Sequence, residues 1–504
     1  MPNPTITIEF YDGTAWRDIT GDVIMKIKWG HGITSQGPTD RVASAGMLNL
    51  EMNNSVSNSG AKVGYYSRDH ANTRTGWVLG AKIRTKLVSG GNTRYDLYKI
   101  KKIVPSAGQY KDRRVKVTAA DYMDEMENRK VSGLTVQTNQ YGGALFTTLI
   151  ATMPIAPTAT SYDTGLYLLP YSFHDEANEA TYCISVAQKI AQSDMSYIYV
   201  DGDSTGGETL RYEQPQARYH NTTSAATFTN TMIELSLSQD VENVFNKVKI
   251  TTNPVEIGTP GEVLATYDGV VSLEPSETNK KITLRYVDQG STRRISAMDL
   301  ITPVAGTDYI MSSVSGSESG DMNGDLTISF TDNGNNIQAT LTNGSSTRKG
   351  FIKPLQARGT KVTTFNKVES EAEDSTSITA YTERTIDFNM PYQTSTTVGE
   401  TVAAELLRRH KDPATQIQKI KYNANRSTTF MGYALTLGIG SRITITEAVS
   451  GISTAFFINA VEFELEDDIL NVSYVVEKAF GASGATYFKL DTNTFADTSI
   501  LIPL

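Results

Sequence analysis

Three carboxylates spaced two residues apart are the side chains of this sequence best placed to do chemistry. Glu462, Glu464 and Glu466 alternate with apolar residues along one predicted strand. Two carboxyl groups that face each other across a sugar can hydrolyse a glycosidic bond. A period of two, however, places all three carboxylates along one face of a strand. We therefore expect a solvated acidic strand face, one that could line a lumen, and no catalytic pair.

The histidines of this chain do not form a known metal or nucleophile motif. None of the five belongs to an HExxH or HxH pattern: His31, His70, His174, His220 and His410. His174 stands beside acidic residues, and helix capping by Asp175 explains that placement. The sequence also lacks a GxSxG elbow and a P-loop. We therefore predict no enzyme activity, no catalytic residues, no bound metal and no cofactor.

Two further candidates have simpler structural explanations. The single cysteine, Cys183, excludes an internal disulfide, and its apolar neighbours at helical spacing predict a buried thiol. Residues 321–325 (DMNGD) resemble the start of a calcium loop, but Asp332 holds the twelfth position, where an EF-hand has Glu. Because residues 326–330 predict a strand, we favour no calcium site, but the sequence leaves calcium binding near Asp321–Asp325 open.

The composition fits a large, β-rich protein that does not hold nucleic acid tightly. A chain of 504 residues is long enough for three or four domains. Only 20% of the residues are charged, while Thr, Ser, Asn and Gly, which suit strands and turns, are abundant. The net charge is -9 and Lys and Arg are not clustered, so tight phosphate binding is not expected. An acidic surface would let DNA slide past without sticking.

The sequence also lacks a membrane-spanning segment and a secretion signal. The sequence has no run of 18 apolar residues that would span a bilayer. Its first residues, MPNP, lack the basic and apolar regions of a secretion signal. We therefore expect synthesis in a cytoplasm and no stable membrane insertion.

Strand and turn signals divide the first half of the chain into two parts. Residues 1–125 predict a β-barrel or sandwich, in which Gly90-Gly91-Asn92 turns a hairpin and Asp121 caps a short helix. Residues 126–254 predict an α+β domain, whose second helix is capped by Asp175. The helices are expected over 122–128, 141–153 and 175–191. The strands are expected over 5–10, 23–29, 46–52, 81–88, 95–104, 113–119, 195–200, 209–214 and 244–251.

The second half predicts an inserted β-sandwich and another β-rich region. Residues 255–365 are rich in Gly, Ser and Asn and predict the sandwich. Residues 366–478 predict strands, one helix over 399–410, and a clear hairpin that turns at Asp467-Asp468. The last segment, 479–504, is polar and small but ends in apolar residues, so we expect it to dock on this fold or on a neighbour. The sandwich strands are expected over 281–287, 325–330, 337–342 and 351–357.

Five short patterns, taken in their order along the chain, resemble those of phage tail hub proteins. This family includes the baseplate hubs of contractile phages and the N-terminal part of type VI secretion spike proteins. One segment departs from the pattern, because residues 55–64 are rich in Ser and Asn where many relatives have an Asp-Gly turn. The matching segments are WRDIT at 16–20, AGMLNLEMN at 45–53, TAADY at 118–122, NKVKI at 246–250 and LGIGSRI at 437–443.

The resemblance implies a mainly β-fold and a structural role. The expected fold has two tail-tube-like β-barrels, at 1–125 and 366–478, with the α+β domain and the sandwich outside them. A homotrimer would then present six barrels in a ring that adapts a six-fold tail tube to a three-fold tip and provides a conduit for DNA ejection. Glu462, Glu464 and Glu466 would face its lumen. The expected location is the tail tip or baseplate of the virion.

The resemblance also implies the partners of the chain. These are further copies of itself, a distal tail or tail-tube ring protein, the tape-measure protein, and tip, spike or fibre proteins, with DNA only in passage. Other functions stay open at this point: a receptor- or glycan-binding tail protein, a wall-degrading enzyme, or a hexameric distal-tail or tube ring protein. Sugar binding, peptidoglycan hydrolysis and a six-fold mass, respectively, would distinguish them.

Overall fold

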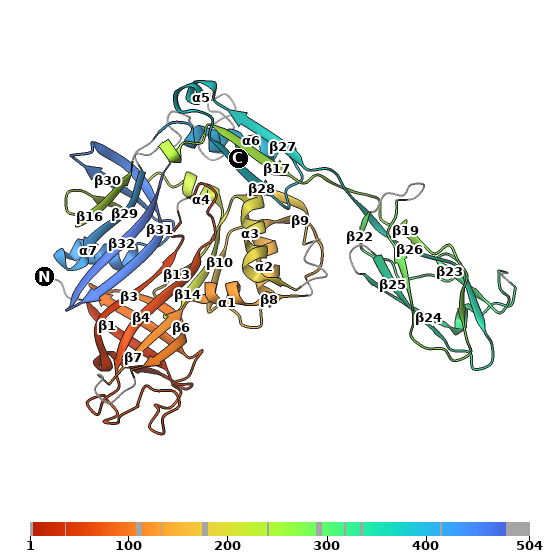
Figure 1. The fold of residues 1–504 in the computed structure, drawn as a ribbon, viewed down its shortest axis with the longest axis horizontal. Coiled ribbons are helices and arrows are strands. Elements are labelled where there is room, and N and C mark those ends of the chain that lie inside the picture. The colour runs from red at the N-terminus through yellow and green to blue at the C-terminus, as the bar shows by residue number, and fades with distance from the viewer. Residues whose placement is uncertain are drawn as a thin grey trace.

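The computed structural model describes residues 4–479, except residues 36 and 133 and the segments 107–112, 174–179, 239–240, 289–294, 317–318, 333–335 and 414–415. Within this part the chain is mainly β, which confirms the expected fold class. A large curved sheet, a mixed helical and stranded unit and a projecting sandwich follow one another across the molecule (Figure 1). The docking tail predicted for 479–504 lies outside the described residues, apart from Ala479.

The first part of the large sheet comes from the N-terminal strands. Their residues alternate between core and solvent, as in β4, where Met52 is buried and Glu51 is partly exposed. The turn predicted at Gly90-Gly91-Asn92 is a two-residue hairpin turn, in which Gly90 and Gly91 both have positive φ. The strands are β1 (Thr5–Tyr11), β2 (Trp16–Asp18), β3 (Val23–Gly32), β4 (Ser44–Asn53), β5 (Lys82–Ser89), β6 (Asn92–Pro105) and β7 (Arg114–Ala120).

The second part of the same sheet comes mostly from the C-terminal strands. The predicted hairpin turn is confirmed, because Asp467 and Asp468 have φ values of 49° and 64°, a left-handed conformation that Asp tolerates. Helix α7 (Thr428–Thr436) lies against β5 and β6 of the first part, and through Phe430 it also packs against these C-terminal strands. They are β15 (Ala226–Phe228), β16 (Glu234–Ser238), β29 (Gln416–Asn423), β30 (Arg442–Glu447), β31 (Ile452–Glu466) and β32 (Ile469–Lys478).

Strands β3 and β31 join the two parts edge to edge. They pair antiparallel, and Trp29 stacks on Phe463 with ring centroids 5.0 Å apart. Gly30 allows this close approach, because a Cβ there would lie 2.6 Å from the carbonyl oxygen of Val461. The buried residues of both parts form a continuous core. Regions more than 400 residues apart in sequence therefore share one sheet and one core.

The α+β unit packs against the large sheet. Asp121 caps α1 as predicted, accepting a hydrogen bond from the Met123 amide. Helix α3 does not begin at residue 175, because Thr181 and Tyr182 pair with β8 and the helix starts at Cys183; the predicted cap, Asp175, lies outside the described residues. The elements are α1 (Tyr122–Asn128), β8 (Lys130–Val131), β9 (Gln137–Tyr141), α2 (Gly142–Ala151), β10 (Ala159–Tyr162), β11 (Leu168–Ser172), β12 (Thr181–Tyr182), α3 (Cys183–Asp194), β13 (Tyr197–Gly202), β14 (Glu208–Glu213) and α4 (Pro215–Tyr219).

A small sheet with its own core connects this unit to the sandwich. Strand β17 (Lys247–Thr252) lies between β27 (Val368–Glu373) and β28 (Thr385–Met390), and α6 (Thr396–His410) covers it. Helix α5 (Ser375–Tyr381) follows β27. Residues from the range expected for the second barrel thus pair with a strand from the α+β range. The sequence-based domain ranges themselves stay predictions.

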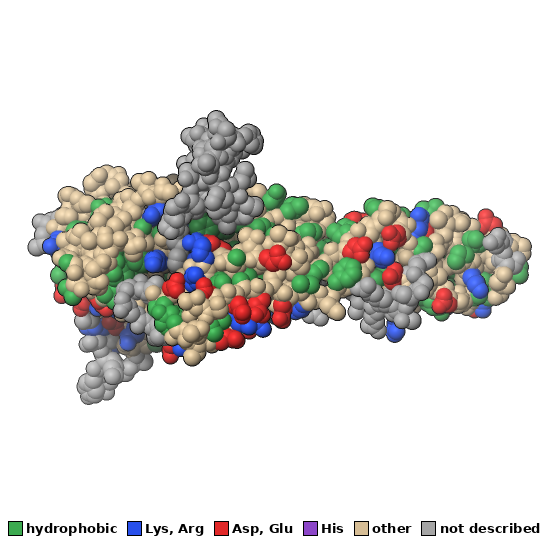
Figure 2. Space-filling model, turned by 90° about the horizontal axis from the view of Figure 1, so that it is seen from above, with side chains coloured by type: hydrophobic (Ala, Val, Ile, Leu, Met, Phe, Trp, Pro, Cys, Tyr) green, Lys and Arg blue, Asp and Glu red, His purple; other side chains and the backbone are tan. Residues whose placement is uncertain are grey.

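The sandwich projects from the rest of the molecule, as Figure 2 shows from above. Strand β26 is long enough to pair with five others, and the sheet that it organises packs through a separate core against β21, β24 and β25. No helix in the described ranges is long and apolar enough to cross a membrane. The strands are β18 (Val255–Ile257), β19 (Glu262–Thr266), β20 (Val271–Leu273), β21 (Lys280–Arg285), β22 (Ser296–Met298), β23 (Tyr309–Ser312), β24 (Leu326–Asp332), β25 (Asn336–Asn343) and β26 (Gly350–Thr364).

Candidate functional site

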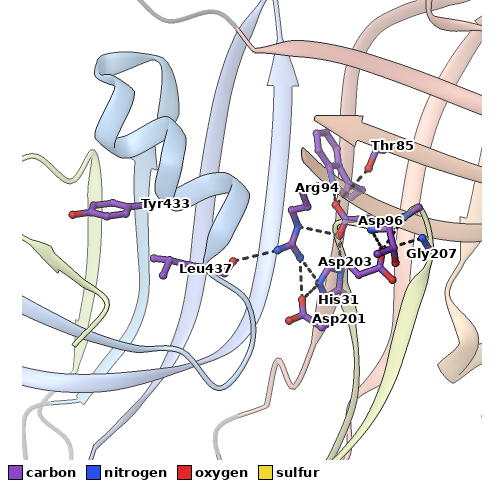
Figure 3. A network of polar contacts seen from close by, with 12 residues as sticks. His31, Thr85, Arg94, Asp96, Asp201, Asp203, Gly207, Tyr433 and Leu437 are labelled. Carbon is purple, nitrogen blue, oxygen red and sulfur yellow. Dashed lines mark hydrogen bonds and ion pairs between the residues drawn. The ribbon is translucent and has the colours of Figure 1, made fainter. Parts of the chain in front are cut away.

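A buried network of charged side chains lies where three parts of the chain meet (Figure 3). Its centre is Arg94 on β6, whose Nε donates to Asp96 Oδ1 at 3.1 Å and whose Nη2 donates to Asp201 Oδ1 at 3.0 Å. Arg94 Nη1 donates to the carbonyl of Leu437 at 3.2 Å, and His31 Nε2 lies 3.0 Å from Nη2. The network therefore links β3 and β6 to β13 and to the loop after α7.

The charges of this network stabilise one another in a dry environment. Burial alone would lower the pKa of Arg94, but the carboxylates of Asp96 and Asp201 raise it above its ordinary value. Burial would raise the pKa of Asp201, but Arg94 and His31 lower it to about 2. Trp29 Nε1 also donates to Asp96 Oδ2 at 3.0 Å. Arg94 and Asp201 therefore stay ionised at neutral pH, and the network acts as a fixed joint between the parts.

Sequence reasoning did not bring this network together. The sequence pattern leaves His31 outside any motif and gives no sign of a role for Asp201. A local signal exists, since Arg94 and Asp96 are charged residues at a spacing of two that share a strand face with Tyr98 and Ile100. Charged residues on such a face are buried only when they are paired. Their partners on β3 and β13 could not be read from spacing.

The three glutamates predicted to share a strand face do so on β31, but lysines from β3 on one side and from β29, beyond β32, on the other surround them. Lys28 Nζ lies 3.1 Å from Glu464 Oε1, and Lys421 Nζ lies 2.8 Å from Glu464 Oε2. Hydrogen bonds from Lys26 and Lys421 lower the pKa of Glu464 to about 2. The remaining ion pairs are Lys26 with Glu464 and Glu466, and Lys419 with Glu462. The strand is acidic, whereas the sheet face around it is mixed.

This face is hollowed where its strands carry small residues. A groove of about 470 Å³ has Gly30, Ala45 and Gly46 among its lining residues, together with Lys28 and Glu462. A groove lined by both lysine and glutamate side chains suits transient polar contacts better than tight binding of one ion.

No family model matches the sequence, and no curated protein matches it. The 43 kDa tail protein of prophage MuSo2 from Shewanella oneidensis is similar in structure, with a TM-score of 0.50 and 9% identity, over 94% of this chain and 99% of that chain. The chain has the fold of a prophage tail protein. The resemblance predicted from the short motifs is thus confirmed at the level of fold.

Two further solved structures are similar to this tail-protein fold at lower scores. The tail protein from Neisseria meningitidis MC58 has a TM-score of 0.48 at 9% identity, over 94% of this chain and 96% of that one. A type VI secretion system component from E. coli has a TM-score of 0.38 at 6% identity, over 91% of this chain and 73% of that one.

The other candidate residues take structural places within the tail-protein fold. Burial raises the pKa of the Cys183 thiol to about 12, as a buried structural thiol requires. Asp325, in the possible calcium loop, pairs with Arg348 at 2.9 Å. No group of three or more His, Cys, Asp or Glu side chains in the described ranges is arranged to hold a metal. His174 lies outside the described residues.

A pair of buried carboxyl groups, Asp121 and Glu208, joins α1 to β14. Glu208 Oε2 accepts a hydrogen bond from the Tyr122 amide at 3.2 Å, and burial raises the pKa of Glu208 to about 7. Burial and the neighbouring Glu208 also raise the pKa of Asp121. The folded protein therefore holds protons that the unfolded chain releases at lower pH.

Stability should consequently fall as the pH rises from about 4.5 to about 7, and the Glu208→Gln variant should lose this part of the dependence. Glu208 ionises near 4.5 in the unfolded chain and near 7 in the folded one, so the folded state binds more protons between these values. We expect the variant to be more stable at pH 8 by about 3 kcal/mol. Urea unfolding at pH 5 and pH 8 measures this. The exposed control Glu400→Gln should keep the wild-type slope, and an equal slope in both variants would contradict the assignment.

Proposed function

We propose that this chain is a structural protein of a phage tail, at the tail tip or baseplate, where copies form a ring around a passage for DNA. The observation that carries the proposal is the pairing of β3 with β31, which sets two β-rich parts side by side in one sheet. The shared fold with a prophage tail protein over nearly the whole of both chains supports it. Three chains with two such parts each would match a six-fold tube on one side and a three-fold tip on the other.

The sheet offers an edge at which such a ring could close. Strand β16 ends the hydrogen-bonded order of the large sheet. Leu237 on this strand is 40% exposed, and Ile233 just before it is 59% exposed. An open edge with apolar side chains favours pairing with another chain. The ring would contact a tail-tube or distal-tail ring protein and the tape-measure protein, and the projecting sandwich would be free to meet tip, spike or fibre proteins.

A trimer should be detected by light scattering on the purified protein over a range of concentrations. Three chains of 55.1 kDa give about 165 kDa. Leu237→Arg should lower this mass by placing a charge at the edge, whereas Val449→Arg, on a 96% exposed side chain, should not. A hexamer would favour a tube or distal-tail ring protein instead. A monomer at every concentration would contradict ring formation by this chain alone.

A further inference from the structure

The basic side chains of this protein are concentrated in one stretch of the chain. Residues 54–120, which include β5, β6 and β7, contain 14 Lys and Arg but only three Asp and Glu, a formal charge of +11. Since the whole chain carries -9, the rest of it carries -20. The prediction that Lys and Arg are not clustered is wrong for this stretch, because the average over the whole chain hides it. An asymmetry of this size indicates a surface for an anionic partner.

Part of this positive charge is neutralised within the protein. Arg94 is buried in the network described above. Other cations of the stretch lie beside acids from β1, β4 and α1, so they are not free to hold a separate anion. These pairs are Arg84 with Glu9, Lys99 with Glu125, Lys101 with Asp124 and Arg114 with Glu51.

Three exposed lysines of β5, β6 and β7 remain, and none of them forms an ion pair with a described residue. They are Lys82, Lys102 and Lys116, here called the basic strip. Glu51 lies opposite Lys116 in the sheet, but it is the partner of Arg114. Buried Glu208 interacts with Lys82 only at longer range. The ammonium groups of the strip are therefore available to an anion from outside the chain.

The register of the strands places the basic strip on one face of the sheet, in a diagonal row. Lys82 on β5 lies opposite Lys99 on β6, and Lys102 takes the next position on that face after a bulge. Lys102 lies opposite Thr118 on β7, and Lys116 is two residues from Thr118. Diagonal neighbours in a sheet are about 7–8 Å apart. The three lysines thus form a regularly spaced row of positive charges.

This row lies on the same sheet face as the glutamates of β31. In the row of Lys102, Thr118 pairs with Asn49 on β4. Asn49 in turn pairs with Lys28 on β3, and Lys28 pairs with Glu464 on β31. A polyanion that lies across this face would meet the basic strip at one end and the glutamates at the other. The strip would then attract it, while the glutamates would keep the contact weak.

The chemistry of the basic strip favours the phosphate backbone of duplex DNA. The cores of protein interfaces are depleted in lysine and enriched in aromatic residues, and the strip contains no aromatic side chain. Single-stranded nucleic acid would also need aromatic side chains, on which its bases stack. Duplex DNA carries one negative charge per about 1.7 Å of its axis, so it offers a phosphate to each lysine of a row.

We propose that the basic strip binds the phosphate backbone of duplex DNA, weakly and without sequence preference. The choice of DNA as the polyanion rests on the proposed role around a DNA passage. The geometry of the strip does not depend on that role, because all three lysines belong to one chain.

Anisotropy of a labelled duplex, titrated with the full chain at rising salt, tests the proposal. Three phosphate contacts should weaken the affinity roughly 40-fold between about 50 and 200 mM salt. Changing Lys82, Lys102 and Lys116 together to glutamine should remove most of this salt dependence, and Lys116→Gln alone should remove about a third of it. Two duplexes of different sequence should bind equally, because phosphate contacts carry no sequence information.

The matched control removes the same charge from the projecting sandwich. Lys281, Arg285 and Lys353 are exposed there, and glutamine at all three should leave the affinity and its salt dependence unchanged. Equal losses in the two triple variants would show that only net charge matters and would overturn the proposal. A wild type without salt-dependent binding would overturn it too. Competition by polyglutamate as strong as that by unlabelled duplex would favour an acidic protein as the partner instead.

The result separates this inference from the proposed ring. A trimer that does not bind the duplex would refute DNA binding by the strip and leave the ring in place. A monomer that binds the duplex through the strip would support this inference and contradict ring formation by the chain alone.

Discussion

Replacing Arg94 with methionine should lower the free energy of unfolding by about 3–5 kcal/mol. Methionine fills much of the same volume but removes the charge that compensates two buried carboxylates. Asp96 is 1% exposed and Asp201 is 6% exposed, so water cannot replace the lost partner. The Leu437 carbonyl would lose its donor as well. Urea unfolding followed by tryptophan fluorescence measures the change, and Trp29, which donates to Asp96, reports on the network directly.

The matched control for this prediction is an arginine in an exposed ion pair. Arg17 pairs with Asp12 at 2.6 Å, but its side chain is 52% exposed. Removing an exposed pair changes stability by at most about 1 kcal/mol, so Arg17→Met should unfold close to the wild type. The free energy of unfolding of Arg94→Lys should lie between those of Arg94→Met and the wild type, because an ammonium cannot reach Asp96, Asp201 and Leu437 in one plane. If Arg94→Met were as stable as Arg17→Met, the network would not be the joint between the parts.

The features that the sequence predicted well depend on near neighbours in the chain. The cap at Asp121 needs only the amide two residues later, and the hairpin at Asp467-Asp468 needs only the alternation on either side. The predicted start of α3 was wrong because it depends on a contact with a residue far away in the sequence. The apolar spacing around Cys183 continues upstream, but Thr181 and Tyr182 pair with a strand some 50 residues away. Because of that pairing the helix starts only at Cys183.

The charge of the candidate lumen face shows the same limit. Periodicity predicts which residues of one strand share a face, and it placed the glutamates of β31 correctly. It does not predict which strands lie alongside. Lys26 pairs with Glu466 across 440 positions, and Lys419 with Glu462 across 43. The Arg94 network is hidden for the same reason, since Asp201 is 107 positions away.

Changing Glu462, Glu464 and Glu466 together to glutamine should therefore do more than neutralise an acidic strand. The lysines that face them, at positions 26, 28, 419 and 421, would be left without acidic partners. The set of four lysines and three glutamates would change from a formal charge of +1 to +4. Lysines freed in this way can neutralise DNA phosphates, so the face should retain DNA in a salt-dependent manner. The protein should still fold, because most of these ion pairs are at least partly exposed and such pairs contribute little.

The chain offers a control with the same charge change on a different sheet. Glu369, Glu371 and Glu373 also alternate along a strand, β27, and Glu371 pairs with Lys247 at 2.8 Å. Their change to glutamine should raise DNA retention far less and leave DNA delivery by assembled particles intact, because β27 lies outside the large sheet. The β31 variant should assemble but deliver DNA poorly, and its retention should weaken as salt rises. Equal retention and equal infectivity of the two variants would show that the β31 face does not line the path of the DNA.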